Sequence, residues 1–244
     1  MKPSTSIVIQ NVSFTYDNKP IFSNLCTHFK GGLFNILLGT SGVGKSSLLK
    51  MIAGLLPISN GAIKCDHPDP LKKIISYMGQ QDLLMPWLTI YKNVTFGDKL
   101  RGVVKDKKRA AHILEQVGLT SALHQYPHQL SGGMRQRVAL ARTLYEDRPI
   151  VLMDEPFSAL DSVTRTKIQN YTAQLLKNKT VILITHDPFE ACRIGETIQI
   201  LAGQPAQLIP VCPIDEPIPR SPQSPKVQQA HSDLLSILIQ HSNA

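Results

Sequence analysis

The segment that most constrains this chain is a glycine-rich loop at residues 39–46, between an apolar run and an amphipathic segment. The apolar run at 36–38 predicts a buried strand, and the helical spacing of Leu48, Leu49 and Ile52 predicts a helix that opens at Lys45. The loop reads Gly-Thr-Ser-Gly-Val-Gly-Lys-Ser, and the pattern Gly-x-x-x-x-Gly-Lys-Ser is typical of loops that cradle phosphate groups. A plain connecting turn needs no lysine there, so we favour a phosphate-binding loop.

Unpaired backbone donors explain why such a loop binds anions. The first N–H groups of a helix lack intrahelical partners and carry partial positive charge, and successive N–H groups of a glycine-rich turn form a concave nest. We expect Lys45 to reach the β- and γ-phosphates and the Ser46 hydroxyl to bind Mg²⁺. The residues expected around the phosphates are Gly39, Thr40, Ser41, Gly42, Val43, Gly44, Lys45, Ser46 and Ser47.

Two further apolar strands are predicted to deliver polar residues to the same edge of a parallel sheet. The run at 150–153 ends in Asp154 and Glu155, and the run at 181–185 ends in His186. Because ligands of an open parallel sheet bind at the carboxyl ends of its strands, we expect Asp154 to hold Mg²⁺ and Glu155 to act as general base on the attacking water. Two adjacent acids can also be an ordinary pair at a strand end, but their position after an apolar strand favours catalysis.

A second candidate anion site lies at Leu130-Ser131-Gly132-Gly133, just before a predicted helix over 134–145. Two phosphate-binding helix starts in one chain suggest a head-to-tail, two-fold dimer in which Lys45 of one copy faces Ser131 of the other. Glycine pairs before helices are also common N-caps, so this segment alone leaves the dimer open.

Charge and hydropathy narrow the class of protein. The chain has 26 Lys and Arg against 18 Asp and Glu, a net charge of +8, which permits contact with nucleic acid or anionic lipid and also suits a protein that handles ATP. No apolar run approaches the about 20 residues that span a bilayer, and the first residues lack the apolar core of a signal peptide. We therefore expect a soluble, internal protein.

Three other segments keep more than one interpretation. The only tryptophan, Trp87, lies in an apolar run at 82–89 that suits either the core or a surface groove for a partner helix. By pattern alone, Tyr16 is a half-exposed aromatic of a sheet. Seven prolines between Pro205 and Pro225 predict mostly irregular chain, followed by a short, loosely packed amphipathic helix over 227–240.

Taken together, these motifs resemble the ATP-binding-cassette (ABC) ATPases. Residues 39–46, Gln80, 130–136, 150–155, 158–161 and His186 stand in the order found in that family, and the resemblance covers nearly all of residues 5–203. It implies an α/β P-loop NTPase core with a mainly parallel sheet, an N-terminal antiparallel β subdomain and a helical subdomain. We place this ATPase domain at 1–204, its helical subdomain at about 88–140, and a Pro-rich tail with a short C-terminal helix at 205–244.

The resemblance also implies residue roles. Tyr16 would stack on adenine, in place of the purely structural role that its pattern favours. Gln80 would bind Mg²⁺ and sense the attacking water, and His186 would hold the γ-phosphate.

Other roles that the resemblance implies need a second copy of the chain. Ser131, Gly132 and Gly133 would touch the γ-phosphate that the partner holds, and Asp161 would link the two sites. The cofactors implied are ATP and Mg²⁺. The partners implied are a second copy, two transmembrane permease subunits and a periplasmic or lipid-anchored solute-binding protein, with no nucleic acid, at the cytoplasmic face of the inner membrane.

More narrowly, residues 83–89, 130–137 and 159–165 resemble importer subunits of the nitrate, sulfonate and taurine type. Residues 77–82 resemble the branch that imports the pyrimidine precursor of thiamine. Gly79 stands where many relatives have Phe, and Met134 where many have Gln; neither change removes a catalytic group.

Two other function classes are less consistent with the sequence. ABC ATPases that act on DNA carry a long coiled coil before Leu-Ser-Gly-Gly, whereas here only residues 47–129 intervene, without sustained heptads. A nucleotide-binding regulator that does not turn over would need neither Glu155 nor His186.

Overall fold

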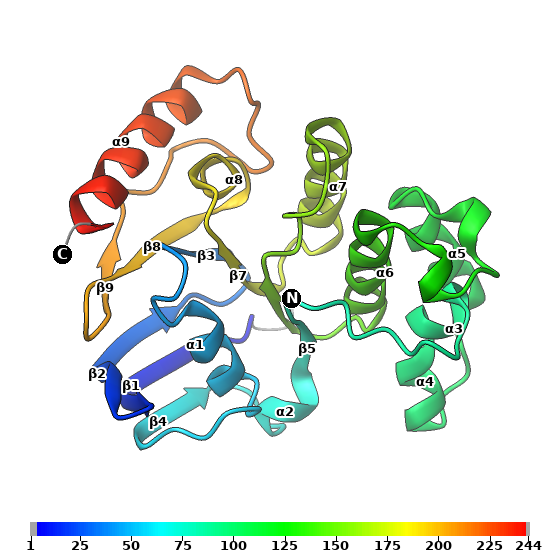
Figure 1. Ribbon diagram of the computed structural model, residues 1–244, viewed down its shortest axis with the longest axis horizontal. Helices are drawn as coiled ribbons and strands as arrows, with labels where there is room; N and C mark the ends of the chain where they lie inside the picture. Colours follow the sequence, from blue (N-terminus) through cyan, green and yellow to red (C-terminus); the bar gives the residue numbers. More distant parts are fainter. Residues whose placement is uncertain (1–3, 243–244) are drawn as a thin grey trace.

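Two β-sheets organise the chain in the computed structural model, which describes residues 4–242 (Figure 1). The larger sheet has the strand order β5-β6-β7-β3-β8-β9 and is parallel except for its last pair, β8 and β9; the smaller sheet, β2-β1-β4, is antiparallel. This is the predicted fold class. The strands are β1 (Ile7–Tyr16), β2 (Lys19–Phe29), β3 (Phe34–Leu38), β4 (Asn60–Cys65), β5 (Ile75–Met78), β6 (Ile150–Asp154), β7 (Thr180–Thr185), β8 (Thr197–Ala202) and β9 (Gln207–Pro210).

The central parallel strands are buried on both faces, as continuous apolar runs predict. Leu37, Leu152 and Ile182 face a core that they share with α1 and the antiparallel sheet. Their neighbours Ile36 and Val151 face the second core, which helices cover. Because side chains alternate along a strand, a slip of one residue would move each side chain into the other core, and the close packing of both cores opposes this.

Most helices surround the larger sheet or form a separate lobe. In Figure 1, α3, α4, α5 and α6 lie together on the right, opposite the antiparallel sheet at the lower left. No helix of the part that the structure describes is both long and apolar enough to cross a membrane. The helices are α1 (Lys45–Ile52), α2 (Leu71–Ile74), α3 (Ile90–Val94), α4 (Phe96–Arg101), α5 (Lys107–Gln116), α6 (Gly132–Tyr145), α7 (Ser162–Leu175), α8 (Pro188–Ile194) and α9 (Pro225–Ser242).

The C-terminal segment packs more tightly than the sequence predicts. β9 pairs with β8, so the sheet continues past residue 204, and α9 lies beside α8 with Val227 and Leu234 buried in the main core (Figure 1). The predicted loose packing of this helix is therefore wrong, because its apolar stripe meets α8. The domain boundaries themselves stay predictions.

One arginine ties the segment between β9 and α9 to the end of α8. Arg220 is 3% exposed. Its Nη1 donates to the carbonyls of Cys192 and Gly195 at 2.8 and 2.6 Å, and its Nε and Nη2 donate to the carbonyls of Glu216 and Ile214, both at 2.9 Å. A cation among the carbonyls at a helix C-terminus is favourably placed, since those groups carry partial negative charge.

Replacing this arginine should destabilise the fold. Arg220→Met removes all four hydrogen bonds and leaves buried carbonyls without donors, so we expect the free energy of unfolding to fall by about 3 kcal/mol in urea titrations. Lys226→Met, an exposed change in the first turn of α9, is the control and should stay within about 0.5 kcal/mol of the parent. Equal stability of the two variants would contradict this role of Arg220.

Candidate active site

Three neighbouring parallel strands end at one edge of the sheet. Leu38 of β3 lies opposite Thr185 of β7, and Asp154 of β6 lies opposite Ile184 of β7. The residues that follow, the loop from Gly39, then Glu155 and His186, therefore leave the sheet side by side. This is the juxtaposition that the sequence predicts for the strand ends.

The glycines of the loop at 39–46 are required by its shape. Gly44 has φ of +104° immediately before α1, and a Cβ there would lie 2.6 Å from Cγ2 of Ile21 and 2.8 Å from Cζ of Phe22. Gly42 has φ of +84°. Side-chain-bearing residues avoid such backbone angles, so the loop can close over the start of α1 only with glycine at these positions.

Lys45 folds back over this loop. It is 6% exposed, and its Nζ donates to the carbonyls of Gly39 and Thr40, both at 2.8 Å. Burial lowers the pKa of the Lys45 ammonium, although the nearby carboxylates of Glu155 and Asp154 act against this. Among the described residues, the hydrogen-bond partners of this cation are therefore backbone carbonyls, which an anion bound in the loop would replace.

Asp154 and Ser46 form a pair of oxygen donors beneath the loop. Asp154 is 2% exposed, and burial raises the pKa of its carboxyl, while a hydrogen bond from Ser46 and the charge of Lys45 act against this. Carboxylate and hydroxyl oxygens are the hard ligands that Mg²⁺ prefers. A buried carboxyl whose ionisation is disfavoured fits a divalent cation, because the cation would stabilise its charge.

Glu155 and His186 are held together in front of this pair. Oε1 of Glu155 lies 2.9 Å from Nδ1 of His186, and the Glu155 backbone, at φ of +51°, donates its N–H to the carbonyl of Ile184 at 3.0 Å. This left-handed backbone is uncommon for a residue with a side chain and often accompanies a functional constraint. A carboxylate paired with an imidazole can accept a proton from a bound water.

A cavity of about 200 Å³ lies against Lys45, Ser46 and Glu155, while Asp154 and His186 are not among its lining residues. Its lining comes from the phosphate-binding loop, from Gln80 after β5 and from Glu155, so the structure brings these predicted residues together. The lining residues are Ser41, Gly42, Gly44, Lys45, Ser46, Ser47, Gln80 and Glu155.

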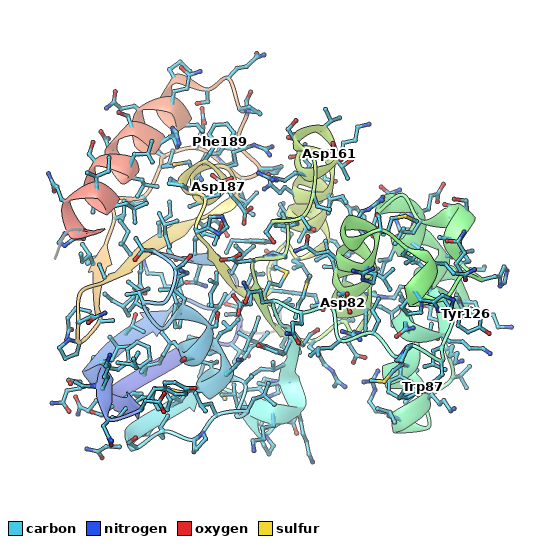
Figure 2. All side chains as sticks on the ribbon, viewed as in Figure 1. Asp82, Trp87, Tyr126, Asp161, Asp187 and Phe189 are labelled. Atoms are coloured by element: carbon cyan, nitrogen blue, oxygen red, sulfur yellow. The ribbon has the colours of Figure 1, made fainter. Side chains whose placement is uncertain are left out.

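Other predicted site residues do not line this cavity. Tyr16 is 63% exposed at the end of β1. Ser131 caps α6 by accepting the N–H of Met134 at 3.2 Å, and the exposed Asp161 caps α7 by accepting the N–H of Thr164 at 3.0 Å (Figure 2). The backbone hydrogen bond from Thr164 lowers the pKa of Asp161. Within one chain these residues and the adjacent Gly132 and Gly133 remain apart from the phosphate-binding loop's cavity.

Gln136 is a residue that sequence reasoning missed. It is 9% exposed; its Nε2 donates to the carbonyl of Glu155 at 2.8 Å, and its Oε1 accepts the N–H of Ala159 at 2.8 Å. It thereby fixes α6 to the segment that carries Glu155. A glutamine among the buried positions Val138 and Ala139 of one helix was the available signal.

The segment after Gln80 is held by two arginines of α6. Nε of Arg135 pairs with Oδ2 of Asp82 at 3.0 Å, and Arg142 donates to the carbonyls of Asp82 and Leu83 at 2.7 and 2.9 Å. A groove of about 460 Å³ lies beside this segment, and Gln80 lines it as well.

The apolar run at 82–89 lies mainly on the surface. Trp87 is 69% exposed and Leu83 58% exposed, whereas Leu84 is buried. Figure 2 shows Asp82 between the helical lobe and the sheet, with Trp87 on the lobe. Of the two interpretations, the surface groove is therefore the one that the structure favours.

Replacing Asp154 should separate stability from ligand binding. Burial disfavours the ionised form of the Asp154 carboxyl in the folded state at neutral pH. Asp154→Asn removes this charge and should therefore raise the melting temperature without ligand by a few degrees. The same variant should lose the further rise that Mg²⁺ with ATP produces in the parent. Asp69→Asn, at an exposed site, should change neither value. A lower melting temperature for Asp154→Asn would contradict this electrostatic account.

Comparisons with known proteins agree with this geometry. The family model described as "ABC transporter" matches residues 22–158. An uncharacterized ABC transporter ATP-binding protein of Haemophilus influenzae is 40% identical over 79% of this chain and 80% of its own, and the aliphatic sulfonates import ATP-binding protein SsuB 2 of Pseudomonas syringae pv. tomato is 36% identical over 84% of this chain and 85% of its own.

Among solved structures, the chain is similar to the ATP-binding cassette MJ0796, described as a dimer in a post-hydrolysis state bound to ADP and Pi. The two share a TM-score of 0.75 and 33% identity, over 88% of this chain and 99% of that one. The chain therefore belongs to the ABC transporter family, as an ATP-hydrolysing cassette that uses ATP with Mg²⁺.

Proposed function

We propose that this chain is the ATPase subunit of an importer and works as a head-to-tail homodimer under two transmembrane permease subunits, at the cytoplasmic face of the inner membrane. The observation that carries the proposal is the Glu155–His186 pair beside the phosphate-binding loop, with the exposed N-terminus of α6 outside that cavity. One chain thus holds a hydrolytic half-site whose remaining anion donors must come from another copy.

Within the half-site, each group has a distinct task. Lys45 leaves the carbonyls of Gly39 and Thr40 and binds the β- and γ-phosphates. Ser46, Asp154 and Gln80 would hold Mg²⁺, which would neutralise charge that develops on the phosphates. Tyr16, exposed at the end of β1, stacks on the adenine.

Glu155 and His186 carry the chemical step. The Glu155 carboxylate accepts a proton from the water in line with the γ-phosphate, a contribution typically worth about 10²–10⁴ in rate. His186 binds the γ-phosphate, and its hydrogen bond to Glu155 orients both side chains. The rest of the acceleration comes from positioning and from charge stabilisation.

The partner copy completes the site. Ser131, Gly132 and Gly133 at the start of α6 donate N–H groups to the γ-phosphate bound by the other chain, and Asp161 connects the two sites. The solved dimers of the similar cassette MJ0796 support a dimeric arrangement for this chain.

Coupling to a permease passes through Gln80. This residue lines both the phosphate cavity and the groove beside residues 81–83, so a change at the nucleotide reaches the groove directly. Exposed Leu83, which lines this groove, and exposed Trp87, four residues further along the chain, offer apolar contacts for a permease segment.

The relatives support an aliphatic sulfonate as the solute, since the import proteins named SsuB are 35–36% identical to this chain. The alternative, a pyrimidine precursor of thiamine, rests only on the resemblance of residues 77–82 to the branch that imports it. A periplasmic or lipid-anchored solute-binding protein would select the solute. Growth of a deletion strain, with and without this gene restored, tests both choices. The aliphatic sulfonate is supplied as the sole source of sulfur in one medium, and the precursor as the sole source of the thiamine pyrimidine in the other.

Changing the proposed base should trap the dimer with ATP bound between its two chains. Glu155→Gln keeps the shape and the hydrogen bond to His186 but cannot accept the proton, so we expect ATP hydrolysis to fall by about 10²-fold or more. Size-exclusion chromatography with Mg²⁺ and ATP should show a stable dimer, and the affinity for ATP should stay near that of the parent. Normal hydrolysis by this variant would refute the role of Glu155.

Removing the exposed tryptophan should uncouple hydrolysis from transport. Trp87→Ala takes away apolar contact with the permease but touches no group of the phosphate cavity. In reconstituted vesicles we expect solute uptake to fall about tenfold, while ATP hydrolysis by the isolated subunit is unchanged. Tyr126→Ala, at a 40% exposed aromatic of the same lobe, is the control (Figure 2). Unchanged uptake by Trp87→Ala would mean that permeases dock elsewhere.

A further inference from the structure

A buried carboxyl without an assigned role lies directly behind Glu155 and His186. Glu190, in the first turn of α8, is 4% exposed and lines the same cavity of about 50 Å³ as those two residues. Its Oε1 has no hydrogen-bond partner in the described part of the chain. Buried polar groups without partners are rare because burial removes their hydration, so this carboxyl calls for an explanation.

The backbone around Glu190 determines where His186 sits. His186 and Asp187 form the short connection between β7 and α8. Oδ1 of Asp187 accepts the N–H groups of Phe189 and Glu190 at 2.9 and 3.3 Å, and its own N–H donates to Oγ1 of Thr185 at 3.0 Å. The orientation of His186 therefore depends on where the first turn of α8 lies.

The Glu190 side chain joins that turn to α7 and, through α8, to the C-terminal segment. Its Oε2 accepts from Nε2 of Gln169 at 3.3 Å, and Oε1 of Gln169 accepts from Nη1 of Arg193 at 2.5 Å. Nε of Arg193 donates in turn to the carbonyl of Arg220 at 3.2 Å. Of these four residues, Glu190 is the one that lines the 50 Å³ cavity together with Glu155 and His186.

The surroundings of Glu190 favour its neutral form. Burial and the carboxylate of Asp187 raise the pKa of Glu190 to about 8, against the charge of Arg165 and the hydrogen bond from Gln169. Arg165 is itself paired with Asp187 at 3.4 Å. The remaining charged or titratable groups around it are Arg193 on α8 and the Glu155–His186 pair across the cavity. Loss of the proton would place a second negative charge beside Asp187.

We infer that Glu190 is a positioning residue that holds the start of α8 so that His186 faces Glu155 and the γ-phosphate. The inference rests on the roles proposed above for Glu155 and His186. A neutral carboxyl stays beside Asp187 without repulsion and keeps the turn against Gln169. An ionised carboxylate is repelled by Asp187, and truncation removes the contact with Gln169, so either change lets the turn and the attached His186 move. His186 is then no longer aligned with Glu155 and the γ-phosphate, so hydrolysis slows, while the phosphate-binding loop and the affinity for ATP are unaffected.

The test compares Glu190→Gln and Glu190→Ala with the parent, using the full-length protein and steady-state ATP hydrolysis from about pH 6 to about pH 10. The parent should lose kcat as the pH rises through about 8, the value at which Glu190 releases its proton. Glu190→Gln cannot ionise, so its kcat at neutral pH should stay within about twofold of the parent and should not show that fall. Glu190→Ala should lower kcat about tenfold with an unchanged KM for ATP.

Several outcomes would overturn the inference. The inference would be wrong if kcat of Glu190→Gln fell at alkaline pH as much as that of the parent. It would also be wrong if Glu190→Ala kept the kcat of the parent. Glu115→Gln, at an exposed site on α5, is the control and should reproduce the parental profile. If Glu190→Ala does not fold, the profile of Glu190→Gln decides alone. A parent without ATP hydrolysis would count against the proposed function instead.

Discussion

The register between β3, β6 and β7 is the constraint on which the rest of the structure depends. Asp154 pairs with Ile184, and Leu38 with Thr185, so the phosphate-binding loop, Glu155 and His186 emerge at one edge of the sheet. A slip of one residue would turn every side chain of the strand to the opposite face, into the other core. Apolar burial on both faces of these strands opposes such a slip, and the catalytic geometry is therefore a consequence of core packing.

The same edge gathers charges that the fold alone does not satisfy well. Burial lowers the pKa of Lys45 and raises that of Asp154, which favours the neutral form of each group. Lys45 meanwhile donates to two backbone carbonyls. A triphosphate with Mg²⁺ supplies the opposite charges that these groups lack. Stability given up at an active site in this way is a common trade against function.

Much of this could be predicted from the sequence because the signals are local. The apolar runs at 150–153 and 181–185 are strands, and the glycines around Lys45 have the backbone angles that the loop pattern requires. The contacts of Gln136, Arg142 and Glu190 could not be predicted, since each depends on which distant segment packs against its helix.

The C-terminal segment shows the same limit. Its prolines correctly indicate little regular structure between β9 and α9, but they carry no information about Arg220, two of whose carbonyl partners, Cys192 and Gly195, lie 28 and 25 residues earlier in the chain. The apolar stripe of α9 indicates a helix without indicating its neighbour. Local pattern thus predicts elements, whereas tertiary partners require the fold.

The central claim is that ATP is held between Lys45 of one chain and Ser131 of its partner. Its most direct test mixes chains carrying Ser41→Cys with differently tagged chains carrying Ser131→Cys, in a background without the four native cysteines. The account predicts an intermolecular disulfide between the two tags that forms only with Mg²⁺ and ATP. Absence of that cross-link, while the mixed chains still hydrolyse ATP, would contradict the account.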